Sequence, residues 1–285
     1  MVEISLWAYF YHAILNPSNM LSSNLILKLI MTPLIIAAAT LVARRWGERI
    51  GGLMIGLPLT SGPVSIFFAI EQGPLYAANA ARGSILGLIP VAVFCTAYVQ
   101  SARHFRWYLA AIFSISLYLA TVWGMSLLVP DLALESLVVP LILGLAFFML
   151  GKMDTLDHAP TSPWWDLPVR MVVATAMLVA ITTGAGSLGS KWGGLLSPFP
   201  IFTFVMVTFS HSQGGAGAAW RLIRGVLAGL FSYTAFFIVV SLLVENTSLW
   251  IVYSLATAAA LAVNGFSFAI LVWRGHLPHT VPSNK

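Results

Sequence analysis

Two arginines are placed where they could bind an anion. Arg82 and Arg224 each lie about five residues inside an apolar segment long enough to cross a membrane, and they enter from opposite sides. A charge inside such a segment is costly and often functional. Glu71 is the only carboxylate near a segment interior on the side of Arg82. We therefore interpret the arginines as anion-binding residues and Glu71 as a gating partner of Arg82. Snorkelling of the long side chains to lipid headgroups is the alternative.

Interrupted helices provide the second chemical feature. GGLMIGLPLTSGPVS begins at position 51, and GGLLSPFPIFTF begins at position 193. Proline removes a backbone donor and glycine loosens a helix, so both segments should break about 12 Å below the membrane surface. Backbone freed at that depth must be buried in protein or line a wet cavity. A packing kink is the alternative to a binding site. The candidate substrate-binding residues at the two breaks are Pro58, Thr60, Ser61, Pro200 and Thr203.

Both breaks belong to a duplication. A shift of 142 residues aligns the chain with itself without a gap, and 11 of the 38 pairs across 51–88 are identical. Leucine and alanine coincide by chance in apolar segments, whereas a shared set of glycine, proline and arginine does not. The identical pairs are Gly51/Gly193, Gly52/Gly194, Leu53/Leu195, Pro58/Pro200, Phe67/Phe209, Gly73/Gly215, Ala77/Ala219, Arg82/Arg224, Gly83/Gly225, Gly87/Gly229 and Leu88/Leu230.

The composition indicates a membrane protein. Hydrophobic residues make up 59% of the chain and charged residues only 8%, against roughly 25% in soluble domains. Backbone groups in lipid must pair within their own segment, which predicts helices. The expected fold is all-α and polytopic, with about nine transmembrane helices. The predicted spans are 25–43, 50–71, 77–99, 107–129, 132–151, 167–186, 193–212, 218–243 and 249–273.

Loop charges orient the spans. Eleven of the 14 lysines and arginines fall on one side, which places the N-terminus outside and the C-terminus in the cytoplasm. The second copy starts five spans after the first, so it enters the membrane inverted, as in many secondary transporters. The predicted parts are an interfacial segment (1–24), repeat 1 with four spans (25–130), a connecting span and linker (131–166), repeat 2 with four spans (167–273) and a cytoplasmic tail (274–285).

Other polar residues suggest less specific roles. His211 near the cytoplasmic end of its span is a candidate for proton coupling, with an ordinary loop histidine as the alternative. Lys28 and Arg170 are interpreted as interfacial anchors. The small-residue runs Gly83/Gly87 and Gly225/Gly229 predict close helix packing.

Several functions are disfavoured. The basic residues are spread over loops on one leaflet, so the net charge of +5 does not indicate nucleic-acid binding. Cys95 is the only cysteine, which leaves no disulfide within one chain. The carboxylates and histidine that cluster, Asp154, Asp157 and His158, are interpreted as part of a linker and not as a metal site. We expect no enzyme, no catalytic residues, no metal and no cofactor.

Each copy resembles a family of small bacterial membrane proteins. GGLLSPFPIFTF at 193–204, followed by Arg224-Gly225, is similar to the GlpM-type proteins, which have four helices in a single copy. The resemblance implies a fused pair of such units and brings no catalytic residues with it. The segment at 51–65 departs from the pattern, with Gly56-Leu57-Pro58 in place of Pro198-Phe199-Pro200. The duplicated helical layout also resembles the drug/metabolite transporter superfamily.

The favoured interpretation is a secondary transporter or exporter in the bacterial inner membrane. Its partners would be the lipid bilayer and a small polar molecule, with anions among the candidates and a homodimer left open. An accessory or structural subunit of an envelope complex is the alternative, and a lipid-modifying membrane enzyme is the third hypothesis. Span counting and loop charges lead to an alternating-access mechanism, in which the two inverted halves open in turn to each side.

Overall fold

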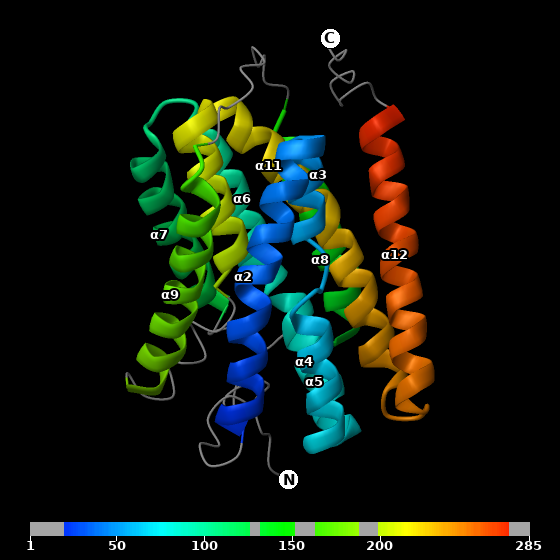
Figure 1. Ribbon diagram of the computed structural model, residues 1–285. Coiled ribbons are helices and arrows are strands. Elements are labelled where there is room, and N and C mark those ends of the chain that lie inside the picture. The colour runs from blue at the N-terminus through cyan, green and yellow to red at the C-terminus, as the bar shows by residue number, and fades with distance from the viewer. Residues whose placement is uncertain (1–19, 126–131, 152–162, 188–198, 274–285) are drawn as a thin grey trace, which may run out of the picture.

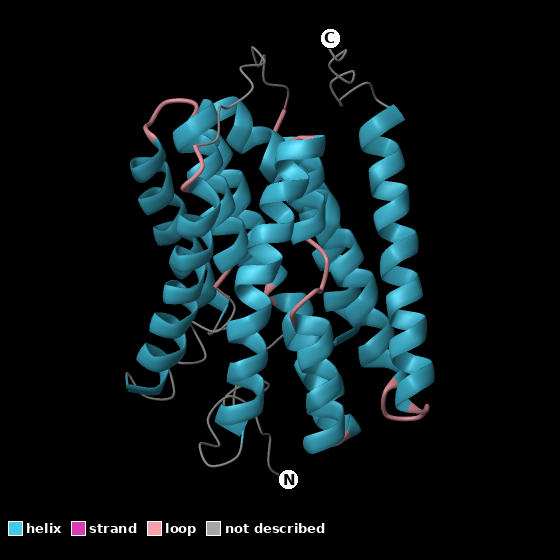
Figure 2. Cartoon of the chain, viewed as in Figure 1, coloured by secondary structure: helices cyan, strands magenta, loops and turns pink. Residues whose placement is uncertain are grey.

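The computed structural model describes residues 20–125, 132–151, 163–187 and 199–273. These residues form helices joined by loops, and no strand occurs among them (Figure 2). The predicted all-α fold is therefore confirmed. The helices are α2 (Met20–Trp46), α3 (Glu48–Ile55), α4 (Ser61–Glu71), α5 (Pro74–Leu86), α6 (Leu88–Ala102), α7 (Trp107–Met125), α8 (Leu132–Met149), α9 (Asp166–Ser187), α11 (Ile201–Leu243) and α12 (Leu249–Trp273).

Some predicted features fall outside these residues. Most of the N-terminal interfacial segment, the linker residues Asp154, Asp157 and His158, and the tail 274–285 are among them. The helices of the described part run along one common direction, with α2 beginning near the end marked N and α12 ending near the end marked C (Figure 1).

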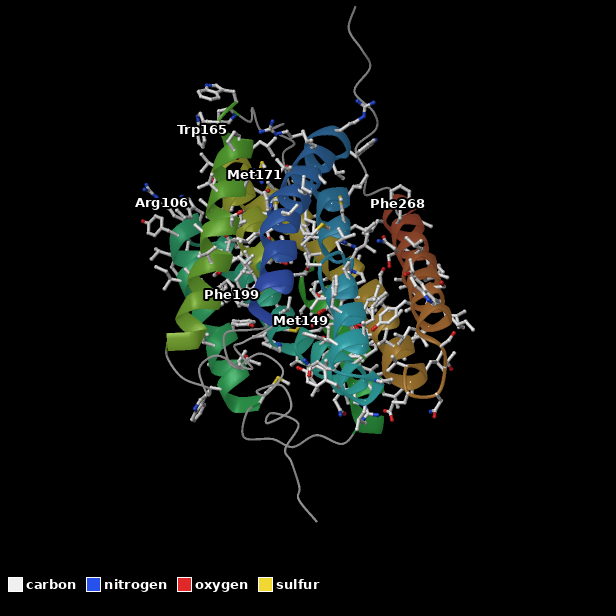
Figure 3. All side chains as sticks on the ribbon, turned by 60° about the horizontal axis from the view of Figure 1, so that its bottom comes forward. Arg106, Met149, Trp165, Met171, Phe199 and Phe268 are labelled. Atoms are coloured by element: carbon white, nitrogen blue, oxygen red, sulfur yellow. The ribbon has the colours of Figure 1, made fainter. Side chains whose placement is uncertain are left out.

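Five helices in the described part of the chain are long and apolar enough to cross a membrane. They cover Leu29–Trp46, Pro74–Ala102, Trp107–Met125, Ile201–Leu243 and Leu249–Leu271. Large apolar side chains are exposed along the outside of the bundle, where water would disfavour them. Trp250 is 87% exposed, and Trp165 and Phe268 point away from the bundle in Figure 3. The chain is therefore a helical protein whose outer surface fits a lipid environment.

The closest approach between helices joins α3 to the second part of α11. A Cβ added to Gly225 would lie 1.9 Å from the carbonyl oxygen of Arg49. One added to Gly52 would lie 2.1 Å from the carbonyl oxygen of Leu222, and one on Gly229 would lie 2.5 Å from that of Leu53. The two backbones are thus in direct contact. The prediction that Gly225 and Gly229 permit close packing is confirmed.

Two glycines of the same repeat position reverse the chain. Gly73 precedes α5 with φ 91° and ψ 166°, and Gly215 bends α11 with φ 70° and ψ −172°. Side chains other than glycine rarely adopt this conformation, because the Cβ clashes with the backbone. The bend divides α11 into residues 201–214 and 216–243, which run in opposite directions. Figure 1 places the α4–α5 turn near the N end of the bundle and the bend of α11 near the C end.

The α3–α11 contact predicts an asymmetry between two glycine substitutions. Gly225→Ala forces the two backbones apart and should destabilise the protein by about 3 kcal/mol. Gly265→Ala, on the open side of α12, meets nothing within 4 Å and should be neutral or stabilising. Melting temperatures of the two variants in the same detergent measure this difference. Equal melting temperatures would contradict the backbone contact.

Candidate functional site

The two predicted breaks have one backbone geometry. In the first, the N–H of Leu59 donates to the carbonyl of Leu57 (2.8 Å) and the N–H of Gly62 donates to that of Pro58 (2.8 Å). In the second, Ile201 donates to Phe199 (2.9 Å) and Phe204 donates to Pro200 (2.8 Å). Each donor and each acceptor is displaced by 142 positions from its counterpart.

The short bond at each break is an inverse γ-turn. Pro200 has φ −81° and ψ 65°, which are the angles of that turn, and it stands immediately before α11. Pro58 lies in the loop between α3 and α4, midway along the bundle in Figure 1. The predicted interruption of the segment 50–71 is confirmed. Residues 193–198 of the other segment lie outside the described part of the chain.

Hydroxyl groups after the first break are held by tyrosines from the second half of the chain. Tyr233 of α11 lies near the hydroxyls of Ser61 and Ser84. Tyr253 of α12 lies 2.9 Å from the Ser65 hydroxyl and donates to the Ser65 carbonyl at 2.7 Å. Ser61 and Ser65 are therefore polar groups at the break that also contact tyrosines of other helices.

The remaining hydroxyls near the breaks differ in their surroundings. Thr60 precedes α4, is half-buried, and makes no capping hydrogen bond through its side chain. Thr203 is buried in the first turn of α11, below Pro200. Thr208 donates to the carbonyl of Phe204 in its own helix at 2.8 Å. Thr60 thus keeps a hydroxyl available for a ligand.

Among the described residues, Arg82 of α5 has no ion-pair partner. Its Nη1 donates to Oδ1 of Asn79 at 3.4 Å. Its buried Nε donates to no partner in the same part of the chain, and the buried hydroxyl of Tyr76 on the same helix also has none there. Glu71 is exposed at the end of α4 and forms no ion pair with Arg82. The predicted Glu71–Arg82 pair is therefore wrong, because α4 ends in a direction that leaves the carboxylate at the surface.

Arg224 occupies the equivalent repeat position in different surroundings. Its guanidinium lies 4.8 Å from the ring centre of Phe147 and 5.1 Å from that of Trp220. Arg49 of α3 approaches Trp220 as well, at 5.2 Å. Stacking on aromatic faces stabilises a guanidinium in a desolvated place. Arg224 is thus buried against aromatic rings, whereas Arg82 is half-buried beside Asn79.

His211 is part of a helix and not of a loop. It lies in α11, is buried, and has its Nδ1 3.3 Å from the hydroxyl of Tyr98 on α6. The two rings meet edge to face at 5.8 Å. The alternative of an ordinary loop histidine is therefore wrong. A role in proton coupling stays a prediction.

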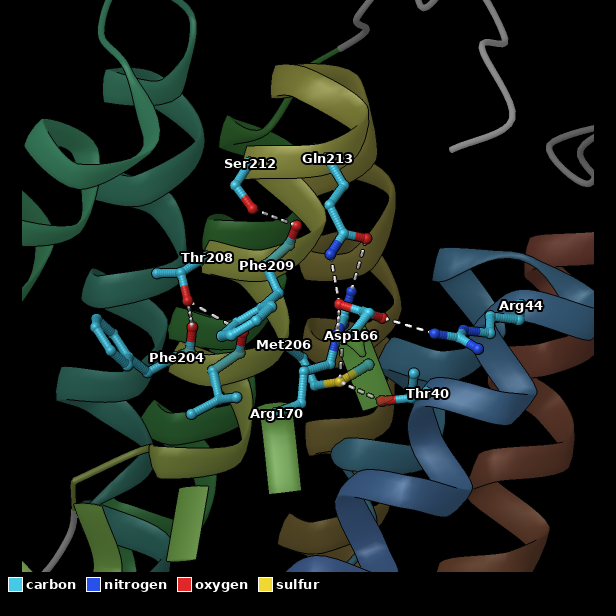
Figure 4. Close-up of polar contacts among 11 residues, drawn as sticks. Thr40, Arg44, Asp166, Arg170, Phe204, Met206, Thr208, Phe209, Ser212 and Gln213 are labelled. Carbon is cyan, nitrogen blue, oxygen red and sulfur yellow. Dashed lines mark hydrogen bonds and ion pairs between the residues drawn. The ribbon is translucent and has the colours of Figure 1, made fainter. Parts of the chain in front are cut away.

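The most extensive ionic network was not predicted. Asp166 at the start of α9 is fully buried, and its carboxylate accepts from Nε of Arg170 at 2.8 Å and from Nη2 of Arg44 at 2.9 Å. Nε2 of Gln213 donates to the same carboxylate. Figure 4 shows these groups converging from α2, α9 and α11. Arg170 is accordingly buried and ion-paired, which corrects the prediction of an interfacial anchor.

Arg170 also contacts three side chains of α11, which belongs to the same half of the chain. Nη1 contacts the sulfur of Met206 at 3.4 Å, Nη2 contacts Oε1 of Gln213 at 3.4 Å, and the guanidinium stacks on Phe209 at 5.2 Å. Burial raises the pKa of Asp166, but the hydrogen bonds and charge of Arg170, with Gln213 and Arg44, bring that pKa below its ordinary value. The spacing Asp166–Arg170 at a helix start could have been read from the sequence.

No cluster of metal ligands occurs in the described part. Groups of three or more histidine, cysteine, aspartate or glutamate side chains are absent from it. Comparison with protein-family models, with curated proteins and with solved structures finds no match for this chain. The resemblance to GlpM-type proteins therefore stays a prediction.

The Asp166 network predicts that replacing Asp166 lowers the stability of the protein by an amount that depends on pH. Asp166→Asn leaves the buried charge of Arg170 without its counter-charge and should destabilise the protein by about 3–5 kcal/mol at neutral pH. The lowered pKa means that the stabilisation is present above about pH 4 and is lost as the pH falls through the folded value. The difference in melting temperature between parent and variant should shrink in acid. A constant difference would show that the carboxylate charge is not the cause.

Proposed function

We propose that the protein is a secondary transporter built from two inverted repeats. The observation that carries the proposal is the repeated break, with equivalent hydrogen bonds at Pro58 and Pro200. Paired interrupted helices in corresponding positions of two halves are the arrangement that transporters use for substrate sites. The matching backbone of Gly73 and Gly215, at opposite ends of the bundle, supports the inversion (Figure 1).

The chain would cross the membrane nine times. Five crossings would each consist of a single helix: α2, α7, α8, α9 and α12. A sixth would consist of α3 and α4 with the interruption at 56–60 between them, and a seventh of α5 and α6 in continuous succession. The two arms of α11 on either side of Gly215 would supply the last two. Each repeat then contains four crossings, with α8 connecting them. An odd displacement of five crossings turns the second repeat upside down.

The basic residues support one orientation. The end of α2, the loop from α6 to α7, and the bend of α11 lie at the same end of the bundle in Figure 1. This end would face the cytoplasm of a bacterial cell, with the protein in the inner membrane. It carries Arg44, Arg45, Arg103, Arg106 and Arg221.

The substrate would be small, polar and negatively charged. Arg82 has a buried Nε without a hydrogen-bond partner, and no carboxylate of the described part pairs with it. Buried polar atoms in native proteins normally have partners. A bound anion would give this Nε a partner and would balance the charge of the half-buried side chain. Tyr76, on the same helix, offers a second unsatisfied donor.

The inverted topology can be tested by labelling. In a Cys95→Ala background, cysteines at Gln72 and Ser212 lie beside the two glycine turns, and both native side chains are exposed. A membrane-impermeant maleimide added to intact cells should label Gln72→Cys, and Ser212→Cys should react only in everted vesicles. Labelling of both from one side would overturn the inverted repeat.

The anion site can be tested by binding. The purified protein is screened by thermal shift against a panel of small carboxylates, phosphates and inorganic anions. At least one anion should raise the melting temperature of the parent, with about 2.7 kcal/mol of stabilisation at a hundred-fold excess over its Kd. Arg82→Ala should abolish the shift, and Arg106→Ala in the exposed α6–α7 loop should retain it. An unchanged shift in Arg82→Ala would exclude this residue from the site.

A further inference from the structure

Two ion pairs between described residues join the two halves at one end of the bundle. In the described residues, Arg44 of α2 pairs with Asp166 of α9 at 2.9 Å, and Glu48 of α3 pairs with Arg221 of α11 at 3.0 Å. Toward the other end, the polar contact of α4 with α12 is a neutral hydroxyl contact, from Tyr253 to Ser65. Ion pairs therefore join the two halves at one end of the bundle, and neutral hydroxyl contacts join them toward the other end.

The Arg44–Asp166 pair is built so that it can open. Asp166 is fully buried, but Arg170 and Gln213 from its own half also hydrogen-bond to it. Breaking a buried pair is costly when it leaves a charge alone, and here Asp166 retains Arg170 as its counter-charge. The side chain of Arg44 is 33% exposed, so it can exchange the carboxylate for water.

The Glu48–Arg221 pair lies on a contact that cannot open in the same way. Glu48 begins α3, whose backbone touches that of α11 at Gly225. Gly47, with φ 91°, separates α3 from α2 and allows the chain to turn there. Helices α3 and α11 therefore form a fixed contact. Helix α2 packs on α3 as closely, because a Cβ added to Gly51 would lie 2.6 Å from Cβ of Ala43 and 3.0 Å from the carbonyl oxygen of Ala39.

Two buried side chains, Thr40 and Met206, lie next to the Arg44–Asp166 ion pair. Thr40, one turn before Arg44 on α2, is 1% exposed and donates to the sulfur of Met206 on α11 at 3.3 Å. Figure 4 shows Thr40 and Met206 beside the Asp166 network. Separation of α2 from α9 would expose these two side chains first.

We propose that the Arg44–Asp166 ion pair is a latch that closes the transporter at this end. The latch holds α2 against α9, and Arg170 and Gln213 keep Asp166 in place while it is open. Release of Arg44 into water lets α2 and α9 part at this end and opens a path toward the breaks at Pro58 and Pro200. This inference rests on the proposed alternating-access function.

The test measures water access to Thr40. Thr40→Cys is introduced in the Cys95→Ala background, and the purified protein in lipid nanodiscs is reacted with a water-soluble maleimide. The parent should react slowly because the site is buried. Arg44→Gln should speed the reaction at least about five-fold, the factor expected from losing an ion pair worth about 1 kcal/mol. Arg44→Lys should restore most of the slow rate.

Two controls separate a latch from general loosening. Glu48→Gln removes the other ion pair of the same corner and should leave the rate at Thr40→Cys unchanged. Ser232→Cys, fully buried on α11, should stay unreactive in the Arg44→Gln variant. Faster labelling at both reporters, an equal effect of Glu48→Gln, or no effect of Arg44→Gln would each overturn the latch.

The labelling uses no substrate, so its outcome is independent of anion binding. Loss of the latch with an intact, Arg82-dependent thermal shift would remove only the gating device. A working latch without any anion shift would instead count against the proposed substrate class.

Discussion

The direct contact between the backbones of α3 and α11 is the constraint on which the other features depend. Gly52, Gly225 and Gly229 leave no space for a Cβ at this crossing. The hydrophobic effect drives little helix association in lipid, so close packing of small residues supplies much of the attraction. Because this crossing joins the first half of the chain to the second, it sets how the loop at Pro58 faces the second arm of α11.

From this contact follows the position of the polar groups. Once α3 lies on α11, the chain continues through the break into α4, where Ser61 meets Tyr233 and Ser65 meets Tyr253. At the other end of α3 the same contact places Glu48 beside Arg221. Gly56, where the break begins, is buried against Gly229 of α11. A membrane helix can be interrupted where its backbone meets protein or a wet cavity and not lipid.

The buried charges divide into two kinds. Asp166 and Arg170 compensate each other at a helix start and are enclosed by Gln213, Met206 and Phe209. The charges of this pair cancel, and its contacts with Gln213, Met206 and Phe209 hold the start of α9 against α11. Arg82 has only a weak contact with Asn79. Chemistry that requires a protein cation is therefore better supplied by Arg82 than by the larger network at the end of α9.

The sequence alone predicts the helical class, the interruption before Ser61 and the close packing at Gly225 and Gly229. These features depend on composition or on the backbone preferences of single residues, which act locally. The fold was needed to show that Asp166 meets Arg44, that His211 is buried against Tyr98, and that Glu71 lies away from Arg82. Those pairings join residues distant along the chain, and helical periodicity shows which face is apolar but not which helix that face meets.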